Sequence, residues 1–414
     1  MPGGLLRVVT AGSVDDGKST LVGRLLHDAK AVLADQLSAV ELASQRRGYE
    51  VADLALLVDG LRAEREQGIT IDVAYRYFAT ARRTFILADT PGHVQYTRNT
   101  VTGASTADVA VILVDARSGV VSQTKRHLAV TSLLRVREVV LAVNKMDLVG
   151  YDESAFDAIV ADFAGAAGKL GVDHFTPIPM TALSGDNVVR SSVNMPWYGG
   201  LPLLGFLEQV EPEIPVALPA RFPVQVVIRP RSADHPDYRG YAGRVEAGVL
   251  RRGDRVRVLP SGLTSSVEAI DTPDGELEEA TCGRSVTLRL RDDLDVSRGD
   301  LIVAEGDPQS IITRELLATV CWLTDQPLRP GDRYQVRHTT RDVRAVVEEV
   351  RSKLDIGSVL EMPATELCLN DIGAVRIRLA EPVAADPYSV NRSTGAFLLV
   401  DEVSGATVAA GMVA

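Results

Sequence analysis

The sequence predicts an α/β domain wound around a mostly parallel sheet, followed by two small β-barrels. Three observations lead to this prediction. Short apolar runs alternate with amphipathic stretches over residues 7–211, as in a wound sheet. Residues 211–219 carry three prolines and have the composition of a stiff linker, and the chain beyond them is rich in short β-type runs. Because 414 residues exceed one hydrophobic core, we expect domains at 1–213, 219–308 and 312–414.

Five apolar runs in the first domain predict buried parallel strands. They cover residues 6–11, 84–88, 109–115, 139–144 and 176–180. Polar motifs begin where these runs end. Open α/β sheets bind ligands beyond the carboxyl ends of their strands, so we expect one site there. Between residues 34 and 67, spaced apolar residues with flanking charges predict inserted helices.

The remainder of the chain predicts strands separated by Gly, Pro and Asp turns. The first set covers residues 222–228, 244–246, 255–259, 286–290 and 301–304. The second set covers residues 315–322, 334–338, 345–350, 374–379 and 397–400. Two barrels, divided near residues 308–313, fit this spacing better than one sandwich.

Composition excludes several classes of protein. Hydrophobic residues make up 46% and charged residues 24%, as in ordinary globular proteins. The longest apolar stretch, residues 109–114, is far shorter than the ~20 residues that a membrane span needs. The N-terminus lacks the regions of a signal peptide, so we expect a cytoplasmic protein without a membrane partner. A net charge of −11 argues against a large nucleic-acid footprint.

The three cysteines are Cys282, Cys321 and Cys368, widely spaced and without a CxxC pair. We expect them to be buried small hydrophobic residues; the alternative is a redox or metal role.

The first polar motif has the form GxxxxGK[ST]. It consists of Gly12, Ser13, Val14, Asp15, Asp16, Gly17, Lys18, Ser19 and Thr20. Its glycines let backbone N–H groups converge on phosphates, and a helix beginning near Lys18 adds its positive end. Lys18 reaches phosphate oxygens as a compact charge, and Ser19 offers a hydroxyl to Mg²⁺. The motif predicts a phosphate-binding loop.

Thr70 lies in a segment with the sequence GITI, between the phosphate loop and the next motif. Its hydroxyl and N–H can engage Mg²⁺ and a γ-phosphate and let go after hydrolysis. The alternative is a plain threonine that precedes a strand.

The next motif follows the second predicted strand. It consists of Asp89, Thr90, Pro91, Gly92 and His93. Asp89 would hold Mg²⁺ through water, and Gly92 frees a backbone N–H for the γ-phosphate. We expect His93 to be catalytic by orienting the attacking water; the alternative is a residue at a helix start without catalytic importance.

Two more motifs predict that the base is guanine. They consist of Asn144, Lys145, Met146 and Asp147, and of Thr181, Ala182 and Leu183. Asp147 can accept from N1–H and the exocyclic amine of guanine, whereas adenine has no donor at N1. The second motif would close the base pocket with a backbone N–H toward the guanine oxygen. The motifs together predict a switch operated by GTP and Mg²⁺.

Several segments resemble known families. Residues 64–71 and 89–93 resemble the translation-factor class of GTPases, and residues 185–187 and 195–198 narrow this to the branch of the archaeal and eukaryotic elongation factor. Other segments resemble the GTPase subunit of bacterial sulfate adenylyltransferase, also called ATP sulfurylase. These are residues 72–78, 95–99, 237–243 and 391–395.

This second resemblance implies a heteromeric enzyme that makes adenosine 5′-phosphosulfate and pyrophosphate from ATP and sulfate. A separate smaller subunit would carry adenylyl transfer, and the GTPase subunit would hydrolyse GTP to drive this uphill reaction. No second phosphate loop follows the first, so we expect an adenylylsulfate kinase, if one is used, on another polypeptide.

Three departures limit what the resemblance implies. Ser13 and Asp16 stand where the bacterial translation factor has histidines, and Thr181 replaces a serine. The loop at residues 231–236 is longer than we expect. Val14 and Ile69 match positions that form an apolar gate before the histidine in translation GTPases, and we hypothesise that docking of the smaller subunit opens this gate and admits His93.

Two rival functions remain. The main one is a translation elongation factor-like GTPase that binds aminoacyl-tRNA, and the other is a free-standing regulatory GTPase. Clustered arginines along one barrel edge would favour tRNA. The arginines are instead interleaved with Asp and Glu, as on solvated faces.

Overall fold

The computed structural model describes residues 3–32, 34–46, 54–57, 72–93, 96–211, 218–230, 238–307 and 311–414. The chain forms two compact units. The first comprises Met1–Pro212 with Asp355–Leu360, and the second comprises Glu213–Leu354 with Glu361–Ala414. The boundaries predicted for three domains stay a prediction, because the expected linker and the expected division between the barrels fall largely outside the described residues.

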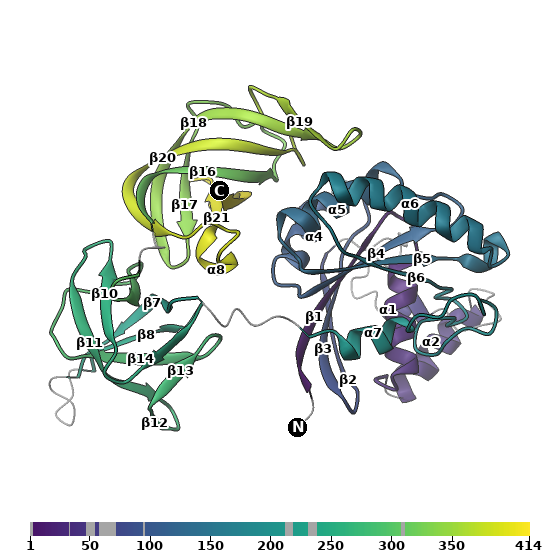
Figure 1. Ribbon diagram of the computed structural model, residues 1–414, viewed down its shortest axis with the longest axis horizontal. Helices are drawn as coiled ribbons and strands as arrows, with labels where there is room; N and C mark the ends of the chain where they lie inside the picture. The colour runs from purple at the N-terminus through teal and green to yellow at the C-terminus, as the bar shows by residue number, and fades with distance from the viewer. Residues whose placement is uncertain are drawn as a thin grey trace. The chain divides into compact units, whose positions relative to one another are not determined.

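Among the described residues, six strands form the sheet of the first unit, in the order β2-β3-β1-β4-β5-β6 (Figure 1). They are β1 (Gly3–Gly12), β2 (Ala74–Ala79), β3 (Arg83–Asp89), β4 (Val109–Asp115), β5 (Glu138–Asn144) and β6 (Thr176–Pro179). All neighbours pair in parallel except β2 and β3, so the predicted parallel sheet is confirmed. The prediction missed β2, whose exposed side chains alternate with half-buried or buried ones and form no continuous apolar run.

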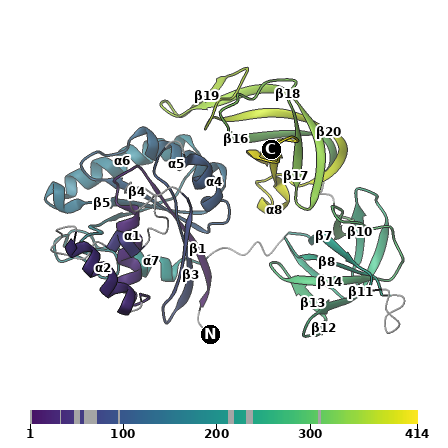
Figure 2. The ribbon, with the colours of Figure 1, turned by 180° about the vertical axis from the view of Figure 1, so that it is seen from behind.

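Helices cover both faces of this sheet (Figures 1 and 2). The helices described in this unit are α1 (Lys18–Asp28), α2 (Ala34–Arg46), α4 (Thr97–Ala104), α5 (Ser122–Leu133), α6 (Glu153–Lys169) and α7 (Leu203–Gln209), with the 3₁₀ turns η1 (Leu54–Leu57) and η3 (Met146–Val149). The helix α2 and the turn η1 lie where inserted helices were predicted.

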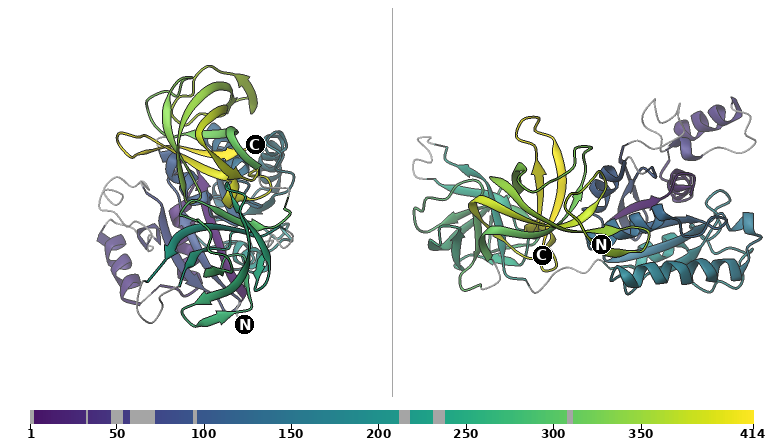
Figure 3. Two further views of the ribbon diagram at one scale, coloured as in Figure 1. Left: turned by 90° about the vertical axis from the view of Figure 1, so that its left-hand side faces the viewer. Right: turned by 90° about the horizontal axis from the view of Figure 1, so that it is seen from above.

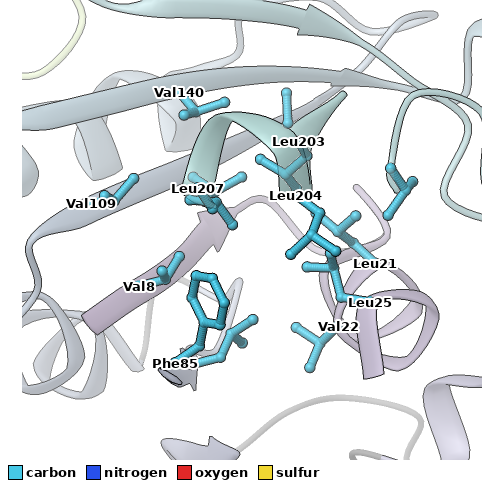
Figure 4. Packing of buried hydrophobic residues seen from close by; sticks show 14 of the residues in the cluster. Val8, Leu21, Val22, Leu25, Phe85, Val109, Val140, Leu203, Leu204 and Leu207 are labelled. Carbon is cyan, nitrogen blue, oxygen red and sulfur yellow. The ribbon is translucent and has the colours of Figure 1, made fainter. Parts of the chain in front are cut away.

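Two apolar clusters hold the sheet, one on each face. Val109, Val111 and Leu113 of β4 face the cluster that includes side chains of α1 and α7, shown in Figure 4. Ile112 and Val114 face the cluster formed with α5 and α6. Each fully buried Val or Leu contributes roughly 1.5–3 kcal/mol. Burial on both faces explains the continuous apolar runs and makes the strand ends a rigid platform.

The second unit contains two closed β-barrels, whose curved strands are visible in Figure 3. The first barrel consists of β7 (Arg221–Ile228), β8 (Gly240–Arg244), β10 (Arg255–Leu259), β11 (Thr264–Thr272), β14 (Ser285–Leu290) and β15 (Leu301–Ala304), closed by pairing of β10 with β11. Short strands β9 (Val249–Arg251), β12 (Gly275–Leu277) and β13 (Glu279–Thr281) accompany it.

The second barrel is closed by pairing of β17 with β18. It consists of β16 (Ile311–Trp322), β17 (Arg333–His338), β18 (Arg341–Asp355), β20 (Ile372–Ala385), β21 (Ala396–Val400) and β22 (Thr407–Val413), with β19 (Leu360–Pro363) at its edge and the short helix α8 (Arg392–Gly395). The predicted fold class of a wound domain followed by two barrels is therefore confirmed.

Three predictions about this unit were wrong or incomplete. The strand expected at residues 244–246 ends at Arg244, and six strands were not predicted: β9, β11, β12, β13, β19 and β22. Cys321 is buried as expected, but Cys282 and Cys368 are exposed. Both exposed cysteines lie at turns, and turns run over the protein surface.

No helix among the described residues is long and apolar enough to cross a membrane.

Candidate functional site

The loop between β1 and α1 forms the floor of the site. β1 ends at Gly12 and α1 begins at Lys18, so the helix N-terminus opens onto the loop. Gly17 has a φ of +92°, and a Cβ there would lie 2.5 Å from the side-chain nitrogen of Asn144. Only glycine fits this position. The N–H groups of the first helical turn, which includes Ser19 and Thr20, point out of the helix N-terminus and suit an anion.

Lys18 is folded over this loop. Its Nζ donates hydrogen bonds to the carbonyl oxygens of Gly12, at 3.0 Å, and Ser13, at 2.7 Å. Burial lowers the pKa of Lys18, although the carboxylate of Asp89 opposes this. A Cβ on Gly92 would collide with the Lys18 ammonium and with the backbone of Ser13. The segment after β3 therefore reaches the phosphate loop, as the motifs predicted.

Asp89 and Ser19 present two oxygens to the same place. The Ser19 hydroxyl donates to Oδ2 of Asp89 at 3.1 Å, and the Thr10 hydroxyl holds Oδ1 at 2.7 Å. Thr90 donates in turn to the carbonyl of Thr10 at 2.6 Å, which fixes the end of β3 against β1. A hydroxyl and a carboxylate are the hard oxygen ligands that Mg²⁺ takes beside phosphates, so these residues fit that ion. Thr70, the third predicted ligand, lies outside the described residues.

His93 follows this segment and is exposed. Its ring lies 6.1 Å from that of Tyr96 in an edge-to-face arrangement. Pro91 and Gly92, by contrast, are buried, so the chain emerges from the interior at the histidine. The imidazole is thus accessible within one residue of the contact with Lys18, and its catalytic role stays a prediction.

Asn144 joins the phosphate loop to the base-side motif. Its Nδ2 donates to the carbonyl of Asp16 at 2.8 Å, and its Oδ1 accepts from the N–H of Ala182 at 2.9 Å. Asn144 is buried, so these bonds are shielded from water. Sequence spacing predicted that these segments meet, and the structure shows how they do.

The other base-side residues divide into core and surface. Met146, Thr181 and Ala182 are buried, whereas the Leu183 side chain is 63% exposed. Asp147 is half-buried within η3. The half-buried Asp147 and the exposed Leu183 are therefore not part of the core beneath them.

Asp115 is a site residue that the sequence analysis missed. It ends β4 and lies 3.0 Å from Nζ of Lys145, which also donates to the carbonyl of Asp15. Arg117 donates two hydrogen bonds to the same carboxylate, at 3.0 and 2.6 Å. Burial alone would raise the pKa of Asp115, but the hydrogen bonds from Arg117 and Lys145 hold it well below its usual range. The sequence feature that could have identified Asp115 is a carboxylate at the end of a buried strand.

Two buried titratable groups lie at the loop: Asp16, a member of the predicted motif, and His127, which the sequence analysis missed. Oδ2 of Asp16 accepts from the N–H of Ser13 at 2.5 Å, and burial raises the pKa of this carboxyl. His127 of α5 contacts Gln123 at 3.1 Å and hydrogen-bonds the backbone of Gly12. Burial, together with the charge of Lys18, lowers the pKa of His127 to about 3. The imidazole is therefore neutral and supports the loop from behind.

The described residues contain no group of three or more His, Cys, Asp or Glu side chains that could hold a metal ion by themselves. The oxygens of Ser19 and Asp89 would therefore share an ion with a phosphate group rather than enclose it. The arrangement as a whole combines an anion cradle with a polar corner able to recognise a flat base.

Comparison with known proteins identifies related chains. Residues 4–217 match the family model for the elongation factor Tu GTP binding domain, and residues 315–414 match the GTP-eEF1A C-terminal domain-like family. The chain is 54% identical to the bifunctional enzyme CysN/CysC of Mycobacterium tuberculosis strain H37Rv, over 99% of this chain and 67% of the relative. It is 51% identical to sulfate adenylyltransferase subunit 1 of Aeromonas salmonicida, over 99% of this chain and 86% of the relative.

The solved structure of Sup35 complexed with GDP aligns with 99% of this chain and 93% of its own, at 23% identity and a TM-score of 0.44.

Proposed function

This chain belongs to the family of sulfate adenylyltransferase subunit 1, within the elongation factor Tu type of GTP-binding proteins, and we propose that it is the GTPase subunit of such an enzyme. GTP hydrolysis drives formation of adenosine 5′-phosphosulfate and pyrophosphate from ATP and sulfate. The observation that carries this proposal is the 51% identity to sulfate adenylyltransferase subunit 1 of Aeromonas salmonicida, over 86% of that relative. In this chain the phosphate and base motifs also meet through Asn144.

In the proposed complex, the triphosphate lies along the loop from Gly12 to Thr20. The N-terminal N–H groups of α1 and the Lys18 ammonium face its oxygens. Asp147 accepts from N1–H and the amine of guanine, and the N–H at Leu183 faces the guanine oxygen. Adenine would leave the Asp147 carboxylate unpaired, and this mismatch disfavours ATP by orders of magnitude.

The residues around Asp89 fit a magnesium ion. Ser19, Thr70 and Asp89 would hold Mg²⁺, which supplies charge neutralisation at the β- and γ-phosphates. Thr10 keeps the Asp89 carboxylate oriented, because it donates to the oxygen that Ser19 does not contact. Gly92 brings its N–H to the γ-phosphate beside Lys18.

Hydrolysis needs a water molecule in line with the γ-phosphate. His93 orients this water in our proposal, since it is the exposed residue next to Gly92. Val14 and Ile69 gate its approach; the Val14 side chain is 36% exposed, and Ile69 lies outside the described residues. Docking of the partner opens the gate, so the isolated chain hydrolyses GTP slowly.

The partner is a separate smaller subunit that carries the adenylyl transfer itself. The word subunit in the names of relatives supports this assignment. The relative from Mycobacterium tuberculosis is called bifunctional and is longer than the region matched here. An adenylylsulfate kinase would consume the product, and the proteins act together in the cytoplasm.

Co-expression with the smaller subunit tests the proposal. Pyrophosphate release from ATP and sulfate should rise many-fold on addition of GTP. It should fall to background when sulfate is omitted, or when extra ATP is added in place of GTP. The variant Lys18→Ala is the matched control, because it removes the phosphate contact without touching the partner's site. No stimulation by GTP, combined with tight binding of aminoacyl-tRNA, would assign the chain instead to the translation factors.

A further inference from the structure

Arg24 lies on α1, less than two turns beyond Lys18, and reaches across to the base-side loop. Its Nε donates to the carbonyl oxygen of Ala182 at 3.2 Å, and its Nη2 donates to the carbonyl oxygen of Leu183. Its Nη1 lies 3.5 Å from Oδ1 of Asp28, one turn further along the helix. Each of the three guanidinium nitrogens therefore has a contact, and because the side chain is only 15% exposed these contacts are largely shielded from water.

The Ala182 residue is therefore held from two directions. Its N–H donates to Asn144, whose amide nitrogen donates to the carbonyl of Asp16 in the phosphate loop. Its carbonyl accepts from Arg24. A trans peptide is planar, with its C=O and N–H pointing in opposite directions. Fixing the Ala182 carbonyl toward Arg24 thus fixes the N–H of Leu183 away from it.

We propose that Arg24 is a positioning residue for purine selectivity, acting through the peptide between Ala182 and Leu183. The inference rests on the proposed function, because the ligand must be a guanine nucleotide. The N–H of Leu183 suits an oxygen at purine position 6, as in guanine and hypoxanthine. An amino group at that position, as in adenine, would oppose it donor to donor. Arg24 keeps this donor aimed, whereas Asp147 recognises the other edge of the base.

This division of labour has a distinct signature. Loss of Arg24 weakens binding of every 6-oxo purine equally, because the amine that distinguishes guanine from hypoxanthine is recognised elsewhere. It leaves the weak binding of ATP unchanged, because ATP does not use the N–H of Leu183. If Arg24 only held α1 in place, its loss would instead lower the affinity for all three nucleotides together, since Lys18 and Ser19 lie on the same helix.

Competition against a fluorescent GDP analogue tests the inference with GTP, ITP and ATP. Arg24→Met should weaken GTP and ITP by the same factor, about tenfold, which is the value of one to two hydrogen bonds. Affinity for ATP should not change, and kcat at saturating GTP with the smaller subunit should stay within twofold. Arg24→Lys should recover part of the loss, because an ammonium reaches one carbonyl but not two.

Two further variants complete the design. Arg82→Met is the matched control: Arg82 lies on the exposed turn between β2 and β3, 3.6 Å from Glu208, and its loss should alter no affinity. Asp28→Asn keeps the guanidinium but removes its ion pair with residue 28, and should lower the affinities for GTP and ITP by a smaller factor than Arg24→Met. It also serves as the readout if Arg24→Met does not fold.

Equal losses for GTP, ITP and ATP, or no loss for any of them, would overturn the role of Arg24. A wild-type chain that does not prefer GTP to ATP would overturn the proposed function as well. The two failures are thus distinguishable by the wild-type protein alone.

Discussion

Nζ of Lys145 lies 3.0 Å from Oδ2 of Asp115, so a charge pair joins the carboxyl ends of β4 and β5. Lys145 has a φ of +62° and also donates to the carbonyl of Asp15. The lysine of the base motif therefore has a role beyond the base, because it anchors the phosphate loop to the neighbouring strand.

Removing the charge of Asp115 should loosen this anchor. In Asp115→Asn we expect GTP affinity to fall about three- to tenfold, or roughly 1 kcal/mol, because Lys145 loses its ionic partner. Isothermal titration calorimetry measures the change. Asp173→Asn, at an exposed position, is the control. An unchanged dissociation constant in Asp115→Asn would show that the pair does not support the site.

Asp147 should determine which purine is bound. In Asp147→Asn the side-chain amide can donate to the carbonyl that xanthine carries in place of the guanine amine. We expect GTP affinity to fall by about two orders of magnitude and XTP affinity to rise. Stimulation of pyrophosphate release should switch from GTP to XTP in parallel. Retention of tight GTP binding would place the base elsewhere.

His93 should affect turnover without affecting binding. We expect His93→Ala to lower GTP hydrolysis stimulated by the smaller subunit by about 10² or more, since a residue that orients water acts in the transition state. The dissociation constant for GTP should stay the same. Single-turnover measurements with the partner present give both values, and full turnover by the variant would remove His93 from the mechanism.

His127 should make the first unit sensitive to acid. Its pKa is about 3 in the folded chain against an ordinary value of 6.5, so below pH 6.5 only the unfolded chain gains the proton. Stability is therefore full above pH 6.5 and is lost as pH falls toward 3, by roughly 1 kcal/mol per pH unit. Urea unfolding monitored at Trp197, in a Trp322→Phe background, reports this unit.

The same experiment on variants isolates the histidine. His127→Gln keeps a polar side chain against the loop and should flatten the slope between pH 6.5 and 4.5. His174→Gln changes an exposed histidine and should leave the slope as it is. A slope that survives in His127→Gln would assign the acid sensitivity to other groups.

Arg221 should be essential to the second unit. It is 2% exposed and donates to both oxygens of Asp386, at 2.9 and 3.0 Å, while also pairing with Asp307. The pair connects β7 of one barrel to the end of β20 of the other. Arg221→Met leaves two carboxylates buried without their cation, and we expect a loss of about 3–5 kcal/mol in the free energy of unfolding.

Thermal and urea unfolding monitored at Trp322, in a Trp197→Phe background, measure this loss. Arg255→Met removes an arginine from an exposed pair with Glu305 and should change stability little. The double variant Arg221→Met, Asp386→Asn should recover part of the loss, because one of the stranded charges is removed. Equal stability of Arg221→Met and the wild type would show that the buried ion pairs of Arg221 do not stabilise the second unit.

The wound sheet and the location of its site could be predicted from the amino-acid pattern alone. Strands such as β4 and β5 are buried on both faces, so all but their end residues are apolar and the run is visible without a structure. The polar motifs must then follow at the strand ends. Strands with one exposed face, such as β2 and β11, have no such run and were missed.

The side chains that support the motifs could not be predicted in this way, because they come from distant parts of the chain. Arg24 and Ala182 are separated by 158 positions, Asn144 and Asp16 by 128, and Arg221 and Asp386 by 165. Local patterns report periodicity and turn chemistry over a few residues, whereas these contacts exist because packing of the sheet and closure of the barrels bring distant segments together. The geometry of a buried charge or amide is therefore set by the fold, and it becomes visible only when the fold is known.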